Sequence, residues 1–350
     1  SFITFSAISY VVDVYRNDAK PGNLLDVAFY LTFFPKVVSG PIVLWKDFSP
    51  KIKCREINVN NFFNGLNRIM IGFAKKLILA DYFGSVVSSI QGQVAYGIDI
   101  PTAWGCALLY TLQLYYDFAG YSDIAIGLAG IFGIELEDNF RFPYTATSTD
   151  FWRKWHISLG TWFKEYVYIP LGGNRKGRIR TLVNLGIVFF ITGVWHGAGG
   201  NYIFWGALHG ICRIFEKCVE KKEWYRKIPN KVKWLCTMLI VMIGWEAFQF
   251  SGLTELFNYY KIMFGFTKFN TNDIFYQFSY FFDKKVIILC VVGVIGATLF
   301  SASKLKKIVY RVQQNNVGLI VQEVVLFGLM IVSVICMINS TYSPFIYFRY

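Results

Sequence analysis

Long apolar runs alternate with short polar and basic segments along the whole chain. The longest apolar run covers residues 104–133, and further runs cover 234–250, 286–303 and 317–338. A helix needs roughly 20 predominantly apolar residues to cross the hydrocarbon core of a bilayer, so these runs predict transmembrane helices. Within hydrocarbon every backbone polar group must be satisfied internally, which favours an all-α polytopic membrane protein.

The N-terminal apolar segments are too short or too interrupted for complete spans. Residues 1–12 are typical of the end of a span, and the chain opens at Ser1 without an initiator methionine or a signal-peptide layout. We therefore expect a fragment that lacks N-terminal spans. Residues 24–34 predict a re-entrant or broken helix, because their run is interrupted before it reaches a spanning length. The interrupting residues are Pro35, Lys36, Gly40 and Pro41.

Two amphipathic segments predict helices that lie in the membrane interface. In residues 62–90 the apolar positions follow helical spacing, and basic residues gather on another face. These basic residues are Arg68, Lys75 and Lys76. They are either solvated near lipid headgroups or placed to meet the phosphates of a donor. Residues 148–169 carry an aromatic stripe and predict a single interfacial helix that ends at Pro170.

Two apolar arms, residues 182–195 and 202–215, are joined by the sequence HGAGG. Basic clusters lie on the outer flanks of the pair, at 175–180 and 217–233, and the positive-inside rule places both flanks in the cytoplasm. The arms predict a helical hairpin whose tip, with His196, lies within the bilayer or near its far face. Glycines after a histidine leave room for a substrate to approach the imidazole.

Composition places the chain among integral, multi-pass membrane proteins. Hydrophobic residues make up 55% of the 350 residues, and a mean hydropathy of +0.41 lies outside the soluble class. The net charge of +13 resides in short basic clusters between apolar runs, as in cytoplasmic loops, so no nucleic-acid partner is expected. The seven cysteines include no CxxC pair, so neither a disulfide framework nor a zinc site is predicted.

All three histidines of the chain, His156, His196 and His209, lie within residues 148–209. Imidazole is the side chain suited to proton transfer near pH 7, so their grouping predicts a single chemical centre. A metal site is not expected, because His156 and His196 are far apart in sequence and no carboxylate lies within a turn of His196. His209, inside an apolar arm, is more typical of a packed core group.

The motifs for other chemistries are missing from the chain. It contains neither the nucleophile elbow GxSxG nor the phosphate loop GxxxxGK[ST]. A histidine base suits the removal of a proton from an alcohol as the alcohol attacks an activated acyl group. Asp117 lies within the 104–133 run, where a carboxylate costs about 2.5–3.5 kcal/mol on insertion scales. It is either a functional group or a buried polar link to a neighbouring helix.

Four motifs make the chain resemble the membrane-bound O-acyltransferase (MBOAT) family, and within it the bacterial AlgI-like branch. They are ISYVVDVYR at 8–16, YYDFAGYSDIAIGL at 115–128, NFRFPYTATSTDFWRKWHISLGTWFKEYVYIPLGGNR at 139–175 and TGVWHGAGGNYIFWGALHG at 192–210. The tail FIYFRY also fits. The joint occurrence of WHISL, YIPLGGNR and WHGA is highly specific.

The resemblance implies one MBOAT transmembrane domain over residues 1–350, with its catalytic core at 139–210. It implies a helix bundle with re-entrant and interfacial helices around a central tunnel, in the plasma membrane of a bacterium. It assigns the invariant family histidine to His196 and a second functional histidine to His156. Other family motif positions, expected to bind substrate or line the tunnel, are Asp117, Asn139, Arg153, Trp195 and Asn174.

The same resemblance implies the substrates. The acyl donor, expected to be acetyl-CoA, reaches the tunnel from the cytoplasm, and the acceptor is an exported cell-envelope polysaccharide or a periplasmic or extracellular acetyltransferase partner. No bound cofactor is expected. The chain departs from the family at Gly200, where an aromatic is common, and this glycine is expected to widen the space behind His196.

Two other functions remain open at this point. One is D-alanyl transfer to a teichoic acid, against which the LGGNR turn argues. The other is a transporter or export channel without chemistry, which Asp117 and Asp123 would permit but in which a histidine pair has no obvious use.

Overall fold

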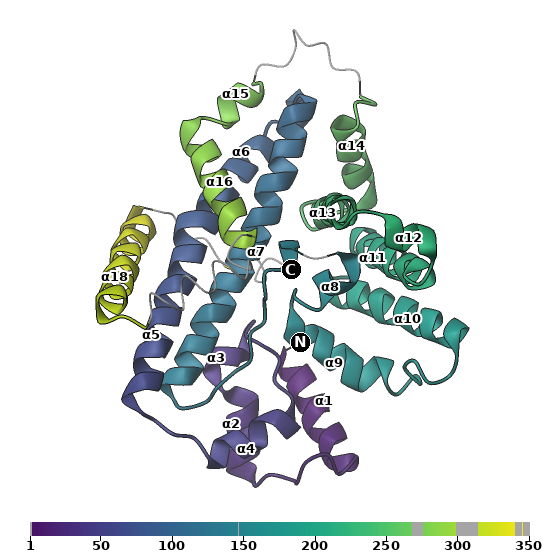
Figure 1. Cartoon of the computed structure of the whole chain (residues 1–350). Helices are drawn as coiled ribbons and strands as arrows, with labels where there is room; N and C mark the ends of the chain where they lie inside the picture. The colour runs from purple at the N-terminus through teal and green to yellow at the C-terminus, as the bar shows by residue number, and fades with distance from the viewer. Residues whose placement is uncertain (1, 146, 268–275, 299–313, 340–344, 346–350) are drawn as a thin grey trace.

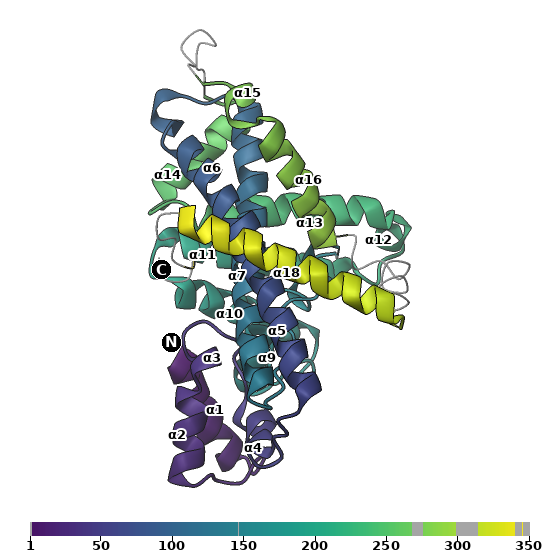
Figure 2. The same cartoon turned by 90° about the vertical axis from the view of Figure 1, so that its left-hand side faces the viewer.

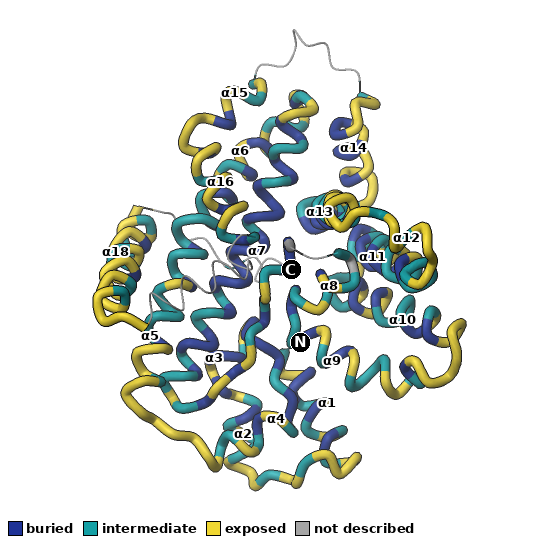
Figure 3. The backbone as a smooth tube through the Cα atoms, viewed as in Figure 1, coloured by how far each residue is buried: buried dark blue, intermediate teal, exposed yellow. Residues whose placement is uncertain are grey.

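The computed structural model describes residues 2–145, 147–267, 276–298, 314–339 and 345, and these residues form helices and connecting loops without a β-strand. Helix α7 (Ile100–Ile131) is the axis on which the others pack (Figure 1). Asp99 caps its first turn, where Oδ1 accepts from the Thr102 backbone N–H at 2.9 Å. Its 32 residues extend about 48 Å at about 1.5 Å per residue. Much of α7 is buried, so it is the core of the fold (Figure 3).

The segment that packs along α7 is α5 (Val59–Phe73), continued by the π-helix η1 (Ala74–Ala80) and by α6 (Asp81–Gln91). Glycines allow the two backbones to touch. A Cβ added at Gly127 would lie 2.5 Å from the Gly65 carbonyl oxygen, and one at Gly72 would lie 2.6 Å from the Gly120 carbonyl oxygen. Any side chain at these positions would push the helices apart.

The basic face predicted on residues 62–90 is turned towards α7, so the predicted solvated face is wrong, whereas contact with the phosphates of a donor stays a prediction. Arg68 and Lys75 form ion pairs with Asp123, with nitrogen–oxygen distances of 3.0 and 2.6 Å. Lys76 pairs with Asp117. The sequence showed that the cations share a face, but two of the carboxylates that face them, Asp117 and Asp123, come from α7.

The N-terminal helices form a small aromatic core against the C-terminal end of α7, around Ile126 and Ala129. They are α1 (Phe2–Tyr15), α2 (Leu24–Thr32), α3 (Phe34–Val37) and α4 (Trp45–Lys53). The predicted break in the second apolar segment is confirmed, because α2 and α3 are separated at Phe33. The Tyr30 ring packs between Trp45 and Phe48, with centroid distances of 5.2 and 5.3 Å.

The predicted single helix over residues 148–169 is instead three pieces. They are α8 (Ser148–Trp152), α9 (Ile157–Phe163) and the π-helix η4 (Lys164–Tyr168). The break between α8 and α9 ends at His156, whose backbone is left-handed with φ 44°. Such a conformation costs a non-glycine residue about 1–3 kcal/mol and persists only where surrounding contacts fix it. The contacts that fix it come from Asn139, outside the predicted helix.

The predicted hairpin is confirmed as α10 (Arg178–His196) and α11 (Gly200–Val219), which pack closely together. A Cβ added at Gly193 would lie 2.6 Å from the Tyr202 carbonyl oxygen. The prediction that Gly200 widens the space behind His196 is wrong, since a Cβ at Gly200 would lie 2.9 Å from the Leu253 side chain. Leu253 fills the volume that an aromatic residue would need.

Further helices complete the described chain. They are η2 (Val94–Tyr96), η3 (Pro143–Thr145), α12 (Glu223–Lys227), α13 (Asn230–Glu246), α14 (Leu253–Met263), α15 (Phe278–Phe281), α16 (Lys284–Thr298) and α18 (Asn316–Asn339). Figure 2 shows α18 lying across α5, where the Asn67 amide donates to Glu323 at 2.7 Å. Among the described residues, α10 and α18 are long and apolar enough to cross a membrane. The other spans and their depth in the bilayer stay predictions.

Candidate functional site

The candidate site is a cavity of about 220 Å³ bounded by α7, α8, α9, α10, α11 and the end of α13. His156 and His196, which are far apart in sequence, both line it. Its walls are mostly apolar and include Phe118, Trp205 and Phe248. A cavity with few polar groups on apolar walls is typical of a site for a small organic substrate.

His156 enters the cavity from the loop between α8 and α9. Its Nδ1 lies 3.2 Å from Oδ1 of Asn139, and its ring meets Phe118 edge-on with centroids 4.6 Å apart. The backbone of the same loop is tied to the Asn139 segment, because the Ile157 N–H donates to the Asn139 carbonyl oxygen at 3.0 Å. The side chain of His156 is 4% exposed, so the ring is held inside the protein.

His196 is the last residue of α10. Its ring packs edge-on against Trp195, Trp205 and Phe248, with centroid distances of 4.7, 5.0 and 5.0 Å. Two of these aromatics also line the cavity. The predicted hairpin tip therefore presents its histidine to the same cavity as His156.

His209 lies behind the cavity wall. Its ring contacts Trp152 and Trp205 with centroids 4.9 and 5.2 Å apart, and it is not among the lining residues. It is 2% exposed. The structure therefore places His209 in an aromatic core, as expected for a packed histidine.

The other predicted site residues are dispersed. Arg153 lines the cavity, whereas Asn139 lies behind His156. Asp117 is buried outside the cavity and pairs with Lys76 at 2.5 Å. Trp195 stacks on Phe5 with centroids 5.4 Å apart. Asn174 lies on the exposed turn after η4, where it accepts from the Tyr168 hydroxyl at 2.5 Å.

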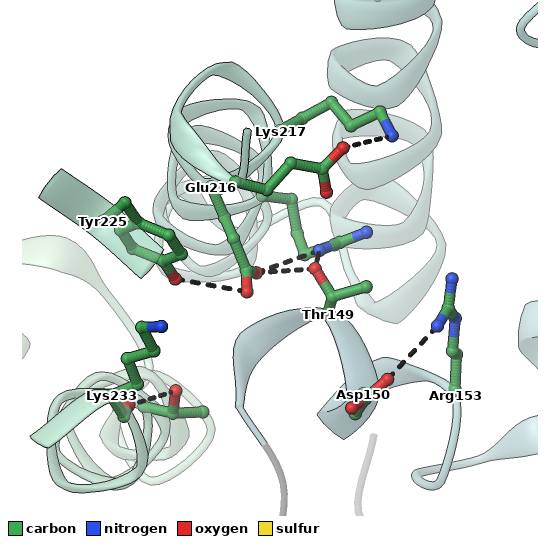
Figure 4. A network of polar contacts seen from close by, with 10 residues as sticks. Thr149, Asp150, Arg153, Glu216, Lys217, Tyr225 and Lys233 are labelled. Carbon is green, nitrogen blue, oxygen red and sulfur yellow. Dashed lines mark hydrogen bonds and ion pairs between the residues drawn. The ribbon is translucent and has the colours of Figure 1, made fainter. Parts of the chain in front are cut away.

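A polar group at one end of the cavity was missed from the sequence. Thr149 and Arg213 line the cavity beside Arg153. The Thr149 hydroxyl donates to Glu216 Oε2 at 2.7 Å, and Arg213 donates to the same oxygen at 3.1 Å and to Thr149 (Figure 4). Arg213 could have been found from the sequence, because it is an arginine inside the apolar arm 202–215. Charged side chains within a membrane segment usually face a cavity or a partner of opposite charge.

Arg153 is the more exposed cation of this polar end. It pairs with Asp150 at 3.2 Å (Figure 4). The Arg153 side chain is 73% exposed, whereas the Arg213 side chain is 14% exposed. The cavity is thus lined by two guanidinium groups and two imidazoles. Among the described residues there is no cluster of three or more histidine, cysteine or carboxylate side chains placed to hold a metal ion.

Comparisons of the sequence with known proteins give the same family as the motifs. The sequence model of the MBOAT, membrane-bound O-acyltransferase family matches residues 4–262. The probable alginate O-acetylase AlgI of Pseudomonas aeruginosa is 40% identical over 279 residues, which cover 78% of this chain and 52% of the relative. The AlgI of Pseudomonas putida is 36% identical over 372 aligned residues, which cover 100% of this chain and 74% of the relative.

A third relative is the peptidoglycan O-acetyltransferase of Helicobacter pylori, 34% identical over 296 residues, or 76% of this chain and 56% of the relative. The chain spans about half the length of the Pseudomonas aeruginosa relative that it matches. The family match covers most of the chain and includes both cavity histidines. This chain therefore belongs to the membrane-bound O-acyltransferase family.

Proposed function

We propose that the protein transfers an acetyl group to a hydroxyl of an exported cell-envelope polysaccharide, with His196 as the general base. The observation that carries this proposal is the single cavity shared by His156 and His196, which come from two separate family motifs. Relatives named as alginate O-acetylases and as a peptidoglycan O-acetyltransferase support the substrate class.

The proposed reaction uses a thioester donor, acetyl-CoA. His196 removes the proton of the acceptor hydroxyl as its oxygen attacks the acetyl carbonyl carbon. The C–S bond breaks, and the departing thiolate takes the proton back from the imidazolium. The histidine returns to its starting state, and the products are an O-acetyl ester and a free thiol. The apolar walls exclude water, which would otherwise compete as the acceptor.

We place donor entry at the polar end of the cavity, with Arg153 and Arg213 facing the phosphates of the donor. Guanidinium groups suit phosphates because they donate in a planar fork and stay charged. The acceptor enters from the opposite membrane face, either as the polysaccharide itself or as a partner that relays the acyl group outside. A multi-pass location in the bacterial plasma membrane is part of the same proposal.

The test of the function is ester-linked acetate on cell-envelope polysaccharide fractions. Cells that express the protein should carry the ester, and a null strain should lose it from one fraction, which identifies the acceptor. Unchanged acetate would contradict the proposal. Loss of D-alanyl ester instead of acetate would assign the chemistry to teichoic acid modification.

Replacement of Arg153 by glutamine is expected to raise the KM for the donor by about 10-fold to 100-fold, since a hydrogen bond to a charged group contributes about 1.5–3 kcal/mol. Stability should change little, because the Arg153–Asp150 pair is exposed. Initial rates against donor concentration measure the effect. Arg141→Gln is the matched control, since Arg141 is also exposed and paired, with Asp138, but does not line the cavity. Equal KM values in both variants would contradict donor entry at this end.

A further inference from the structure

We propose that Asn139 is a positioning residue that fixes His156 in the Nδ1–H tautomer, so that Nε2 is the basic nitrogen of the ring. The consequence for catalysis rests on the proposed function, whereas the tautomer itself does not. Asn139 is 1% exposed and joins α7 to the loop that carries His156.

The orientation of the Asn139 amide is fixed independently of the histidine. Its Oδ1 lies 3.1 Å from the backbone nitrogen and 2.9 Å from the hydroxyl of Ser158. A backbone N–H can only donate, so the amide atom facing it must be the oxygen. The amide nitrogen is turned the other way, where it donates to the Ser122 hydroxyl on α7 at 3.2 Å.

The same oxygen determines the proton position on His156. Oδ1 of Asn139 is an acceptor, and it lies 3.2 Å from Nδ1 of the ring. Nδ1 must therefore carry the hydrogen, and in the neutral imidazole the lone pair is then on Nε2. The bond survives when the ring takes up a proton, because both nitrogens of an imidazolium are donors. His156 can thus accept and release a proton at Nε2 without losing its anchor.

The ring plane is held by the packing already described. Phe118 meets the ring edge-on, and the left-handed backbone of His156 is tied to the Asn139 carbonyl through Ile157. An orienting group that sets a tautomer is the role of the third member in hydrolytic triads, where its loss costs a large part of the rate. Asn139 supplies this function to one of the two cavity histidines.

The test is nitrogen NMR of the purified protein labelled with ¹⁵N in the histidine rings. Substitution of one histidine at a time assigns the signals of His156. In the unaltered protein we expect a protonated Nδ1 and an unprotonated Nε2 at His156. Asn139→Leu should abolish this pattern, whereas Asn139→Asp should keep it, because a carboxylate oxygen also accepts from Nδ1. A His156 ring protonated at Nε2, or an unchanged pattern in the leucine variant, would overturn the proposal.

A matched control separates this effect from general loss of a buried amide. The Asn184 side chain is 0% exposed and donates to the carbonyl oxygens of Leu171 and Gly173. Asn184→Ala should leave the His156 signals in place even where it lowers stability. If Asn184→Ala moves the His156 signals as Asn139→Leu does, the positioning role is wrong.

Kinetics test the catalytic consequence. Asn139→Leu should lower kcat by about 100-fold with the donor KM changed less than about twofold, as expected when a group that lines the cavity with the base His196 is misplaced. Asn139→Asp should recover most of kcat and move the acidic limb of the pH profile to higher pH, because its carboxylate stabilises the imidazolium form of His156 and only the neutral form can accept a proton. An unaltered protein with the expected tautomer but no acetyl transfer would contradict the proposed function alone. Normal acetyl transfer by the leucine variant would contradict the role of Asn139 alone.

Discussion

Replacement of His196 by alanine is expected to lower acyl transfer by at least about 100-fold, because a positioned general base contributes about 100-fold to 10,000-fold. The amount of protein in the membrane should stay the same. His196 ends α10 and faces a cavity, so the substitution removes an imidazole without cutting into the helix pairing. Ester-linked acetate formed per molecule of enzyme measures the effect.

His209 provides the control for this substitution. It is a histidine of the same hairpin with similar aromatic neighbours, but it does not line the cavity. His209→Gln should retain transfer per folded molecule, even if less protein accumulates. Retained transfer in the His196 variant, or equal loss in both variants, would contradict the assignment of His196 as the base.

Replacement of Lys76 by methionine is expected to destabilise the protein by about 3–5 kcal/mol, the usual effect of removing one partner from a buried ion pair. The Lys76 ammonium lies 2.5 Å from Asp117 and 2.7 Å from Asp81, and the Lys76 side chain is 7% exposed. The substitution leaves the buried carboxylate of Asp117 and the partly buried one of Asp81 without the cation that they share. Unfolding of the purified protein by heat or denaturant measures the loss.

The neighbouring lysine is the matched control. Lys75 pairs with Asp123 at 2.6 Å, but its side chain is 27% exposed and Asp123 keeps Arg68 at 3.0 Å. Lys75→Met should therefore cost less than about 1 kcal/mol. Equal costs for the two lysines would show that burial of the Lys76 group does not govern stability.

The role of Asp117 is tested in the same experiments. Its ion pair with Lys76 accounts for a carboxylate within the longest apolar run, so Asp117→Asn should lower stability and leave transfer per folded molecule unchanged. Loss of transfer by a fully folded Asp117→Asn protein would instead give this carboxylate a direct part in the reaction.

The elements of the fold could be predicted because each depends on neighbours in sequence. The apolar run predicted at 104–133 is α7 at Ile100–Ile131, and the run at 317–338 is α18 at Asn316–Asn339. The hairpin around HGAGG and the broken helix at residues 24–34 could also be predicted, since glycine and proline act on the local backbone. Hydrophobic spacing carries this information because a helix closes its hydrogen bonds within four residues.

Contacts between elements could not be read from spacing. The basic face of residues 62–90 was recognised, but its partners on α7 were not. Residues 148–169 have good helical spacing, yet the helix breaks at His156 because Asn139 captures the ring and the backbone of the following residues. Arg213 was not predicted as a site residue, because the sequence does not show that its side chain contacts Thr149 and lines the cavity.

The sequence by itself determined the helical class and the family, and it predicted His196 and His156 as the functional histidines. The motifs WHISL, YIPLGGNR and WHGA indicate the family directly, because a motif is recognised by the order of its residue types and needs no contact between distant segments. Only the tertiary structure decided that His156 and His196 share one cavity, that His209 lies behind its wall, and that Oδ1 of Asn139 faces Nδ1 of His156. The physical reason is that a helix period fixes the face of a residue, whereas distances of about 3 Å between distant segments depend on the packing of the whole chain.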